Sequence, residues 1–218
     1  MFTQLNLKEI EKKAFRANYQ DGLLDINMGG IVACMAYLQT LTDSEETPIL
    51  GMVVFVAGMI ASSLIFWLGK KYITLPRMGQ ATFGTERRRR SRTLAVILGI
   101  IVALQAVVVI FSVVVWGNPE LQSRLTFLEG EHRAMDLLVA SIGAMFVGPS
   151  VALIAYFSDF LRGYYISLLM ATGVFLMIFL NQPVYLMVCA ALIILPGVAL
   201  FVRFLLTHPL PPAEARHG

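Results

Sequence analysis

Six long, continuously apolar segments constrain this chain more than any other feature. They run from Leu23 to Leu41, Ile49 to Gly69, Leu94 to Trp116, Asp136 to Phe157, Tyr164 to Leu180 and Val184 to Leu206. About 20 helical residues cross a hydrocarbon core of about 30 Å, so each segment has roughly the length of a membrane-spanning helix. The segments do not alternate between apolar and polar residues as barrel strands do. The sequence therefore predicts an all-α, polytopic membrane helical bundle with six transmembrane helices.

The composition supports the same class of protein. Of the 218 residues, 57% are hydrophobic and only 14% are charged, whereas about a quarter of an ordinary soluble domain is charged. The first 22 residues are too polar for a cleaved signal peptide. We therefore expect an N-terminal interfacial helix over residues 1–22, a six-helix transmembrane domain over 23–206 with a basic cytoplasmic loop at 70–92, and a cytoplasmic tail over 207–218.

The distribution of Lys and Arg predicts the orientation in the membrane. With the N-terminus inside, 15 of the 17 basic residues lie on the cytoplasmic side, and only Arg124 and Arg133 lie outside. We therefore expect a multi-pass protein with both termini in the cytoplasm. The basic residues near the inner leaflet favour anionic lipid as a partner, and nucleic acid is not expected.

The N-terminal segment has the pattern of an amphipathic helix. Leu7, Ile10, Ala14 and Ala17 share one helical face, and the opposite face is basic. This pattern is typical of a helix lying at the membrane interface. It fits a topological anchor on the inner leaflet, or a docking helix for a cytosolic partner.

Two aspartates stand at the start of the first apolar segment. Asp21 is placed to cap that helix by accepting hydrogen bonds from its first amides. Asp25 follows one turn later, where a carboxylate within a span has to face protein or water. We expect Asp25 to pair with a basic residue of the cytoplasmic loop. The alternative is a cation or proton site that Asp25 forms with Asn27.

The loop between the second and third segments is strongly basic. Tyr72–Leu75 and Gln80–Phe83 flank a Pro-Arg-Met-Gly turn, which predicts a small hairpin, and Thr85 is placed to cap the next helix. Arginines at a helix N-terminus oppose the macrodipole and require nearby anions. Lipid phosphates, Asp21, Asp25 or an acidic partner are the candidates. The cluster could also serve only as an orientation signal. The predicted lipid or partner site comprises Lys70, Lys71, Arg77, Arg87, Arg88, Arg89, Arg90 and Arg92.

Two proline–glycine pairs interrupt later apolar segments. They are Gly148-Pro149 in the fourth segment and Pro196-Gly197 in the sixth. A proline within a helix removes one hydrogen bond and kinks the chain. Such breaks can line cavities in membrane proteins, but the scarcity of polar residues nearby favours kinked packing over a binding site.

The sequence contains few residues suited to catalysis. Cys34 and Cys189 lie in apolar segments and have no partner spacing, and the three histidines are scattered. No nucleophile with a base, metal-ligand cluster, phosphate-cradling glycine loop or zinc-protease motif is present. We therefore expect no catalytic residues, no metal site, no cofactor and no enzymatic activity.

Two motifs carry a resemblance to known proteins. The first is Phe-x-x-x-Tyr-x-Asp-Gly-Leu-x-Asp-Ile, beginning at Phe15, and the second is Pro-Arg-x-Gly-x-x-x-Phe, beginning at Pro76. Over about its first 95 residues the chain resembles uncharacterised small prokaryotic multi-pass membrane proteins. The resemblance implies a location in a prokaryotic plasma membrane and one structural unit joining the acidic start to the basic loop, through Asp25 and Arg77. It implies no activity.

Two functions remain as hypotheses. The first is a membrane accessory or scaffold protein, possessing a basic cytoplasmic face that binds anionic lipid and a partner protein. The second is a small oligomeric transporter or channel that uses Asp25, Asn27 and the kinked fourth and sixth helices. The scarcity of polar residues within the spans favours the first, because ion pathways are lined by charges or carbonyls.

Overall fold

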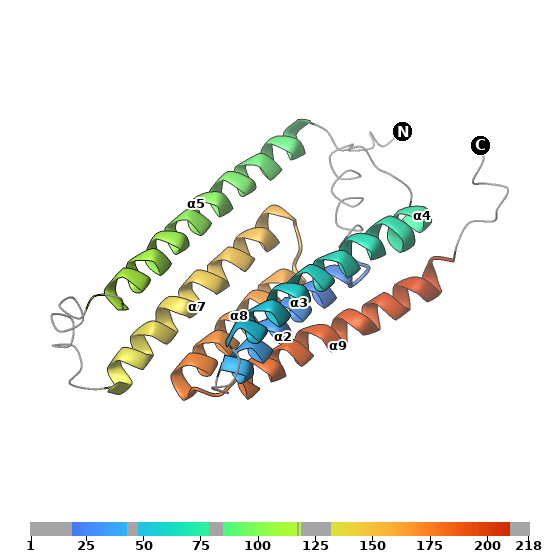
Figure 1. Ribbon diagram of the computed structural model, residues 1–218. Coiled ribbons are helices and arrows are strands. Elements are labelled where there is room, and N and C mark those ends of the chain that lie inside the picture. The colour runs from blue at the N-terminus through green and yellow to red at the C-terminus, as the bar shows by residue number, and fades with distance from the viewer. Residues whose placement is uncertain (1–18, 43–47, 79–84, 117, 119–131, 210–218) are drawn as a thin grey trace.

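The computed structural model describes residues 19–42, 48–78, 85–116, 118 and 132–209. Within these ranges the chain is helical, as the apolar segments predict, and Figure 1 shows the long helices lying side by side. The helices are α2 (Leu23–Thr42), α3 (Pro48–Leu68), the π-helical turn η1 (Gly69–Thr74), α4 (Leu75–Met78), α5 (Thr85–Trp116), α7 (His132–Phe157), α8 (Arg162–Leu180) and α9 (Val184–Thr207). The predicted interfacial helix, apart from Tyr19 to Gly22, lies outside the described residues, as does most of the predicted tail. Tyr19 to Gly22 form a turn.

The core is formed where α2, α7, α8 and α9 meet. α2 packs against α3 on one side and α9 on the other, and α8 packs against α7 and α9. Fully buried side chains such as Val32, Leu186 and Ile193 belong to one continuous apolar cluster. α2 is therefore an inner helix of the bundle.

Among the described residues, five helices are long and apolar enough to cross a membrane, rather than the six expected. They are the helix covering Val53–Arg77, then Arg89–Val108, Asp136–Phe157, Arg162–Leu180 and Val184–Thr207. The predicted first span, now α2, is not among them. Three polar residues, Asp25, Asn27 and Gln39, interrupt its apolar sequence. Its packing between neighbours explains why it carries these residues, because polar groups in a bundle are tolerated where they face protein.

The hairpin expected after the second span is not present in the described part of the loop. Tyr72 to Leu75, predicted as its first strand, instead continue α3 through η1 and α4. In η1 the Leu75 N–H donates to the Lys70 carbonyl, five residues earlier, which is the π-helical pattern. The predicted second strand begins at Gln80 and falls largely in 79–84, outside the described residues.

The two proline–glycine pairs lie within continuous helices. Pro149 is inside α7 and Pro196 is inside α9. Their glycines allow close helix contacts: a Cβ on Gly148 would lie 2.9 Å from the Ala171 Cβ of α8, and a Cβ on Gly197 would lie 2.9 Å from the Asp25 Cβ of α2. The pairs therefore serve helix packing.

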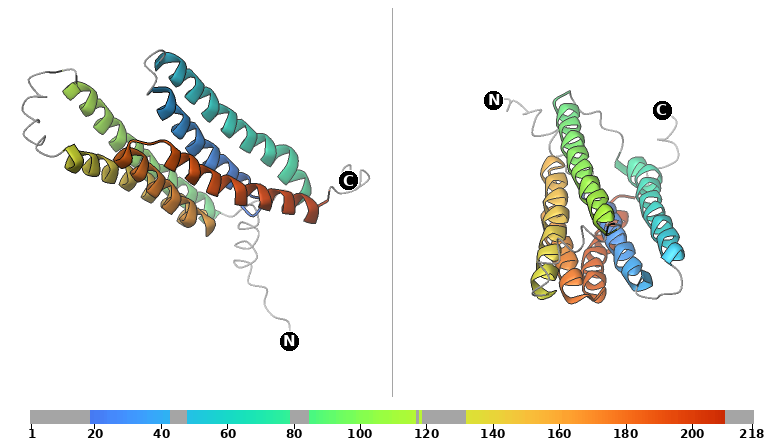
Figure 2. Two further views of the ribbon diagram at one scale, coloured as in Figure 1. Left: turned by 90° about the horizontal axis from the view of Figure 1, so that it is seen from below. Right: turned by 60° about the vertical axis from the view of Figure 1, so that its left-hand side comes forward.

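α5 lies at the edge of the bundle, and its main packing partner among the described helices is α7 (Figure 2). Large apolar side chains such as Val96, Ile100 and Ile110 are more than 60% exposed along it. A Cβ on Gly99 would meet nothing within 4 Å. This exposure is what a membrane-crossing helix surrounded by lipid requires.

Candidate functional site

Charged side chains from five segments of the chain gather at one end of the bundle. This charged end comprises the start of α2, the η1–α4 extension of α3, the start of α5, the turn between α7 and α8, and the end of α9. Three ion pairs lie here: Asp21 with Lys70, Asp25 with Arg162, and Asp159 with Arg90. Most of the residues predicted as functional from sequence are therefore brought to one region.

Asp21 is completely buried and fully engaged. Its Oδ2 lies 2.7 Å from the Lys70 Nζ and accepts a hydrogen bond of 2.7 Å from the Thr74 hydroxyl. Its Oδ1 accepts from the Leu23 N–H at 3.3 Å, at the start of α2. The predicted capping contact is thus present, and Asp21 also holds the end of α3 against α2.

Asp25 pairs with the N-terminal residue of α8. Its Oδ2 lies 3.0 Å from the Arg162 Nη1, and the residue is only 4% exposed. Neither carboxylate oxygen accepts a well-directed hydrogen bond from the described residues. Arg162 is fixed further, because its Nη2 donates to the Tyr19 carbonyl at 2.6 Å and its guanidinium lies 5.3 Å from the centre of the Phe160 ring.

The pairing of Asp25 with Arg77 that the two motifs implied is not present. The Arg77 Nη1 instead donates to the Leu205 carbonyl at 3.3 Å, in the last turn of α9. A cation at this position interacts favourably with the free carbonyls and the negative pole of a helix dipole. Within residues 70–92, Lys70 pairs with an aspartate near the start of α2, which is Asp21 rather than Asp25.

Arg90 joins the start of α5 to the end of α7. Its Nη2 donates to the Tyr156 carbonyl at 2.7 Å, and its Nη1 lies 3.5 Å from the Asp159 Oδ2. The guanidinium also lies over the Tyr156 and Phe157 rings. Asp159, with a positive φ of 51°, occupies the turn that follows. An arginine of the predicted lipid site is thus occupied within the protein.

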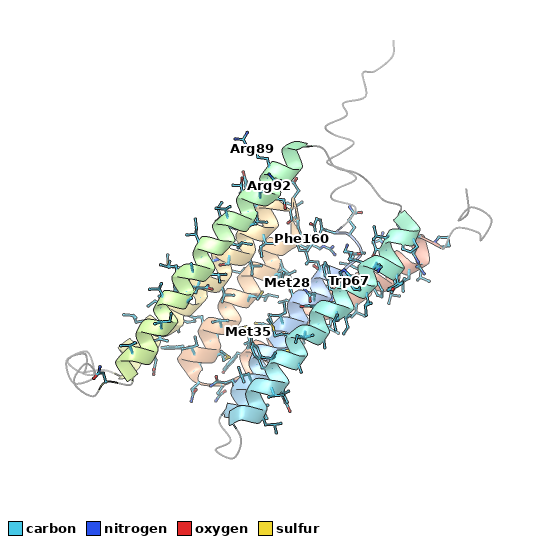
Figure 3. The ribbon with its side chains drawn as sticks, turned by 45° about the horizontal axis from the view of Figure 1, so that its top comes forward. Met28, Met35, Trp67, Arg89, Arg92 and Phe160 are labelled. Atoms are coloured by element: carbon cyan, nitrogen blue, oxygen red, sulfur yellow. The ribbon has the colours of Figure 1, made fainter. Side chains whose placement is uncertain are left out.

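Other basic side chains at this end face outward. Lys71, Arg89 and Arg92, which we call the basic surface, are exposed, and no carboxylate of the described residues lies within salt-bridge distance of them. Figure 3 shows Arg89 and Arg92 extending from the start of α5. The Lys71 Nζ lies 4.7 Å from the centre of the Trp67 ring. The side chains of Arg87 and Arg88 lie outside the described part of the structure.

The residues expected to form a transport pathway are engaged in packing. The Asn27 side-chain oxygen accepts a hydrogen bond from the Ser62 hydroxyl at 3.0 Å, joining α2 to α3. The Ser167 hydroxyl of α8 donates to the Gly148 carbonyl at 2.7 Å. Gly197 lies against Asp25 and Ile26. Within the described residues no group of three or more His, Cys, Asp or Glu side chains could hold a metal ion.

Sequence reasoning missed three participants: Tyr19, Thr74 and Asp159. Asp159 carried a usable signal, because it is the only acidic residue in a short turn that also contains Arg162. Thr74 and the Tyr19 carbonyl carried none. They enter the site through contacts with residues far away in the sequence.

The chain matches no protein-family model, no curated protein and no solved structure. The charged end must therefore be interpreted from its own geometry.

Proposed function

We propose that this multi-pass membrane protein is an accessory or scaffold protein. Its charged end faces the cytoplasm, and the basic surface binds anionic lipid headgroups and an acidic segment of a partner protein. The proposal rests on one observation. Lys70, Arg90 and Arg162 are neutralised by aspartates of the same chain, whereas Lys71, Arg89 and Arg92 are exposed without such partners among the described side chains.

The membrane supplies the missing negative charge. Each basic residue near an anionic surface contributes about 1 kcal/mol of attraction. Lys71 lies beside Trp67 and Tyr72, and such aromatic residues are enriched at the headgroup level of membranes. These contacts support placing the charged end at the headgroup region.

Contacts between the helices make transport the weaker hypothesis. Asp25 is buried against Arg162, Asn27 bonds to Ser62, and the proline-containing helices are closely packed at their glycines. A gate would have to break these contacts in order to open. The scaffold function requires no such rearrangement.

Lipid retention tests the proposal. The double variant Arg89→Gln/Arg92→Gln should retain more than tenfold less anionic phospholipid after mild solubilisation, because two attractions of about 1 kcal/mol each are lost. Bound lipid per chain is measured by phosphorus analysis or mass spectrometry. Loss of a bound acidic partner is expected in the same variant.

The matched control keeps the charge. Arg89→Lys/Arg92→Lys should retain lipid, because diffuse attraction to headgroups depends on charge more than on guanidinium geometry. Both positions are exposed, so the fold is expected to survive either change. Lipid retention by the glutamine variant equal to that of the parent protein would contradict the proposal.

A further inference from the structure

A pocket at the charged end lies between the start of α8 and the last two turns of α9. Its volume is about 530 Å³, and its lining includes Gln20, Arg162, Arg203, Phe204, Thr207 and His208. Leu200, Arg203, Phe204, Thr207 and His208 recur with helical spacing, so one face of α9 forms a wall of the pocket. The pocket is separate from the basic surface of Lys71, Arg89 and Arg92.

The pocket has a positive lining. Arg162 and Arg203 line it; Arg162 is already paired with Asp25, so Arg203 supplies the net positive charge, and no carboxylate of the described residues lines the pocket. Asp25 binds the Arg162 Nη1 but is not itself a lining residue. Arg203 is exposed and has no carboxylate partner among the described side chains. Arginine is suited to phosphate and carboxylate groups because its planar fork donates two parallel hydrogen bonds.

The C-terminal end of a helix ordinarily repels anions, but here three carbonyls in the last two turns of α9 accept hydrogen bonds. The Thr207 hydroxyl donates to the Arg203 carbonyl, and the His208 N–H donates to the Phe204 carbonyl. The Arg77 Nη1 donates to the Leu205 carbonyl. These donors weaken the negative pole of α9.

We propose that this pocket binds a phosphate group, held between Arg162 and Arg203, and that a lipid headgroup is its source. Arg162 is pre-oriented by Asp25 and the Tyr19 carbonyl, so little conformational freedom is lost on binding. The pocket opens to the surface and has an apolar wall, which suits a headgroup still attached to its lipid better than a free ion. Leu200 and Phe204 supply an apolar wall for the rest of the ligand.

The experiment uses the full chain in detergent, with bound lipids counted by native mass spectrometry. Phosphatidylglycerol should bind as one tightly held lipid per chain, and phosphatidylcholine should bind more weakly. Arg203→Gln should weaken this binding about tenfold, the loss expected for one charge-assisted hydrogen bond. Arg203 is exposed and has no ion pair with the described residues, so the Arg203→Gln variant is expected to fold, unlike changes at Arg162.

The control removes an equal charge outside the pocket. Arg92→Gln should leave the tightly held lipid in place. Equal loss in Arg92→Gln and Arg203→Gln, or equal binding of phosphatidylcholine and phosphatidylglycerol, would overturn the pocket. Tighter binding of a hexaglutamate peptide than of any phosphate compound would also overturn the proposal, because the pocket would then be a protein-docking site.

Inorganic phosphate distinguishes the two sources of the ligand. If it raises the unfolding temperature of the parent protein but not of Arg203→Gln, and phosphatidylglycerol adds nothing, phosphate chemistry is supported and the lipid source is rejected. The inference rests on the proposed function only in placing this end at headgroup level. Normal total lipid retention by Arg89→Gln/Arg92→Gln would remove that function while leaving the single tight lipid and its loss in Arg203→Gln unaffected.

Discussion

At the scale of single residues, the two aspartates at the start of α2 are held by cations from distant parts of the sequence. Asp21 binds Lys70, and Asp25 binds Arg162. The sequence showed that a carboxylate at position 25 needed a partner. It could not show which one, because helical periodicity relates residues within a helix but does not specify which loops meet at its end. The choice of Arg162 over Arg77 is made by helix packing.

Loss of one member of this pair should be more harmful than loss of both. Arg162→Gln is expected to destabilise the protein by about 3 kcal/mol, because the buried Asp25 carboxylate would lose its counter-charge. Asp25→Asn added to Arg162→Gln should recover part of that loss. Thermal unfolding is measured in one detergent for the parent protein, Arg162→Gln, Asp25→Asn and the double variant. The four values give the coupling energy between the two side chains. A double variant no more stable than Arg162→Gln alone would show that the pair contributes nothing through charge.

At the scale of elements, helix bounds were predictable because apolar runs end where polar residues or turns begin. The predicted Val184–Leu206 became Val184–Thr207, and Tyr164–Leu180 became Arg162–Leu180. The prediction of a strand at Tyr72–Leu75 was wrong. Local propensity favoured it, but the contacts of Lys70 and Thr74 with Asp21 hold this stretch in a helix.

Glycine packing gives an element-scale prediction. Gly197→Ala should destabilise the protein by roughly 1–3 kcal/mol, because its Cβ would lie 2.9 Å from the Asp25 Cβ and 3.1 Å from the Ile26 nitrogen. Gly99→Ala is the matched control, since nothing lies within 4 Å of its added Cβ, and alanine favours the helix. The unfolding temperature in detergent should fall for Gly197→Ala and stay level or rise for Gly99→Ala. Equal temperatures for both would contradict the close contact between α2 and α9.

At the scale of the whole molecule, the three ion pairs of the described residues all lie at the charged end. The other end contains the turn between α8 and α9, with Gln182 exposed. The orientation of the charged end toward the cytoplasm stays a prediction. The pocket beside α9 was not predictable, because it depends on how α8 and α9 pack and on Gln20, which no motif singled out.

Cysteine labelling tests this arrangement in a membrane. Cys34 and Cys189 are first replaced by alanine, and single cysteines are placed at Arg89, Arg203 and Gln182. A membrane-impermeant maleimide should label positions 89 and 203 from the cytoplasmic face and position 182 from the opposite face. The extent of labelling is measured in right-side-out and in inside-out vesicles. Labelling of 89 and 203 from different faces would refute a common charged end.

The wide turn of η1 has one more consequence. A π-helical turn accommodates one residue more than an α-helix would, and α4 continues directly from it. Deleting one residue between 69 and 74 would let the stretch close into a regular α-helix and keep Arg77 near the Leu205 carbonyl, whereas inserting one would rotate everything beyond by about 100° and carry Arg77 away from it. This stretch can therefore lose one residue, but it cannot gain one without displacing Arg77.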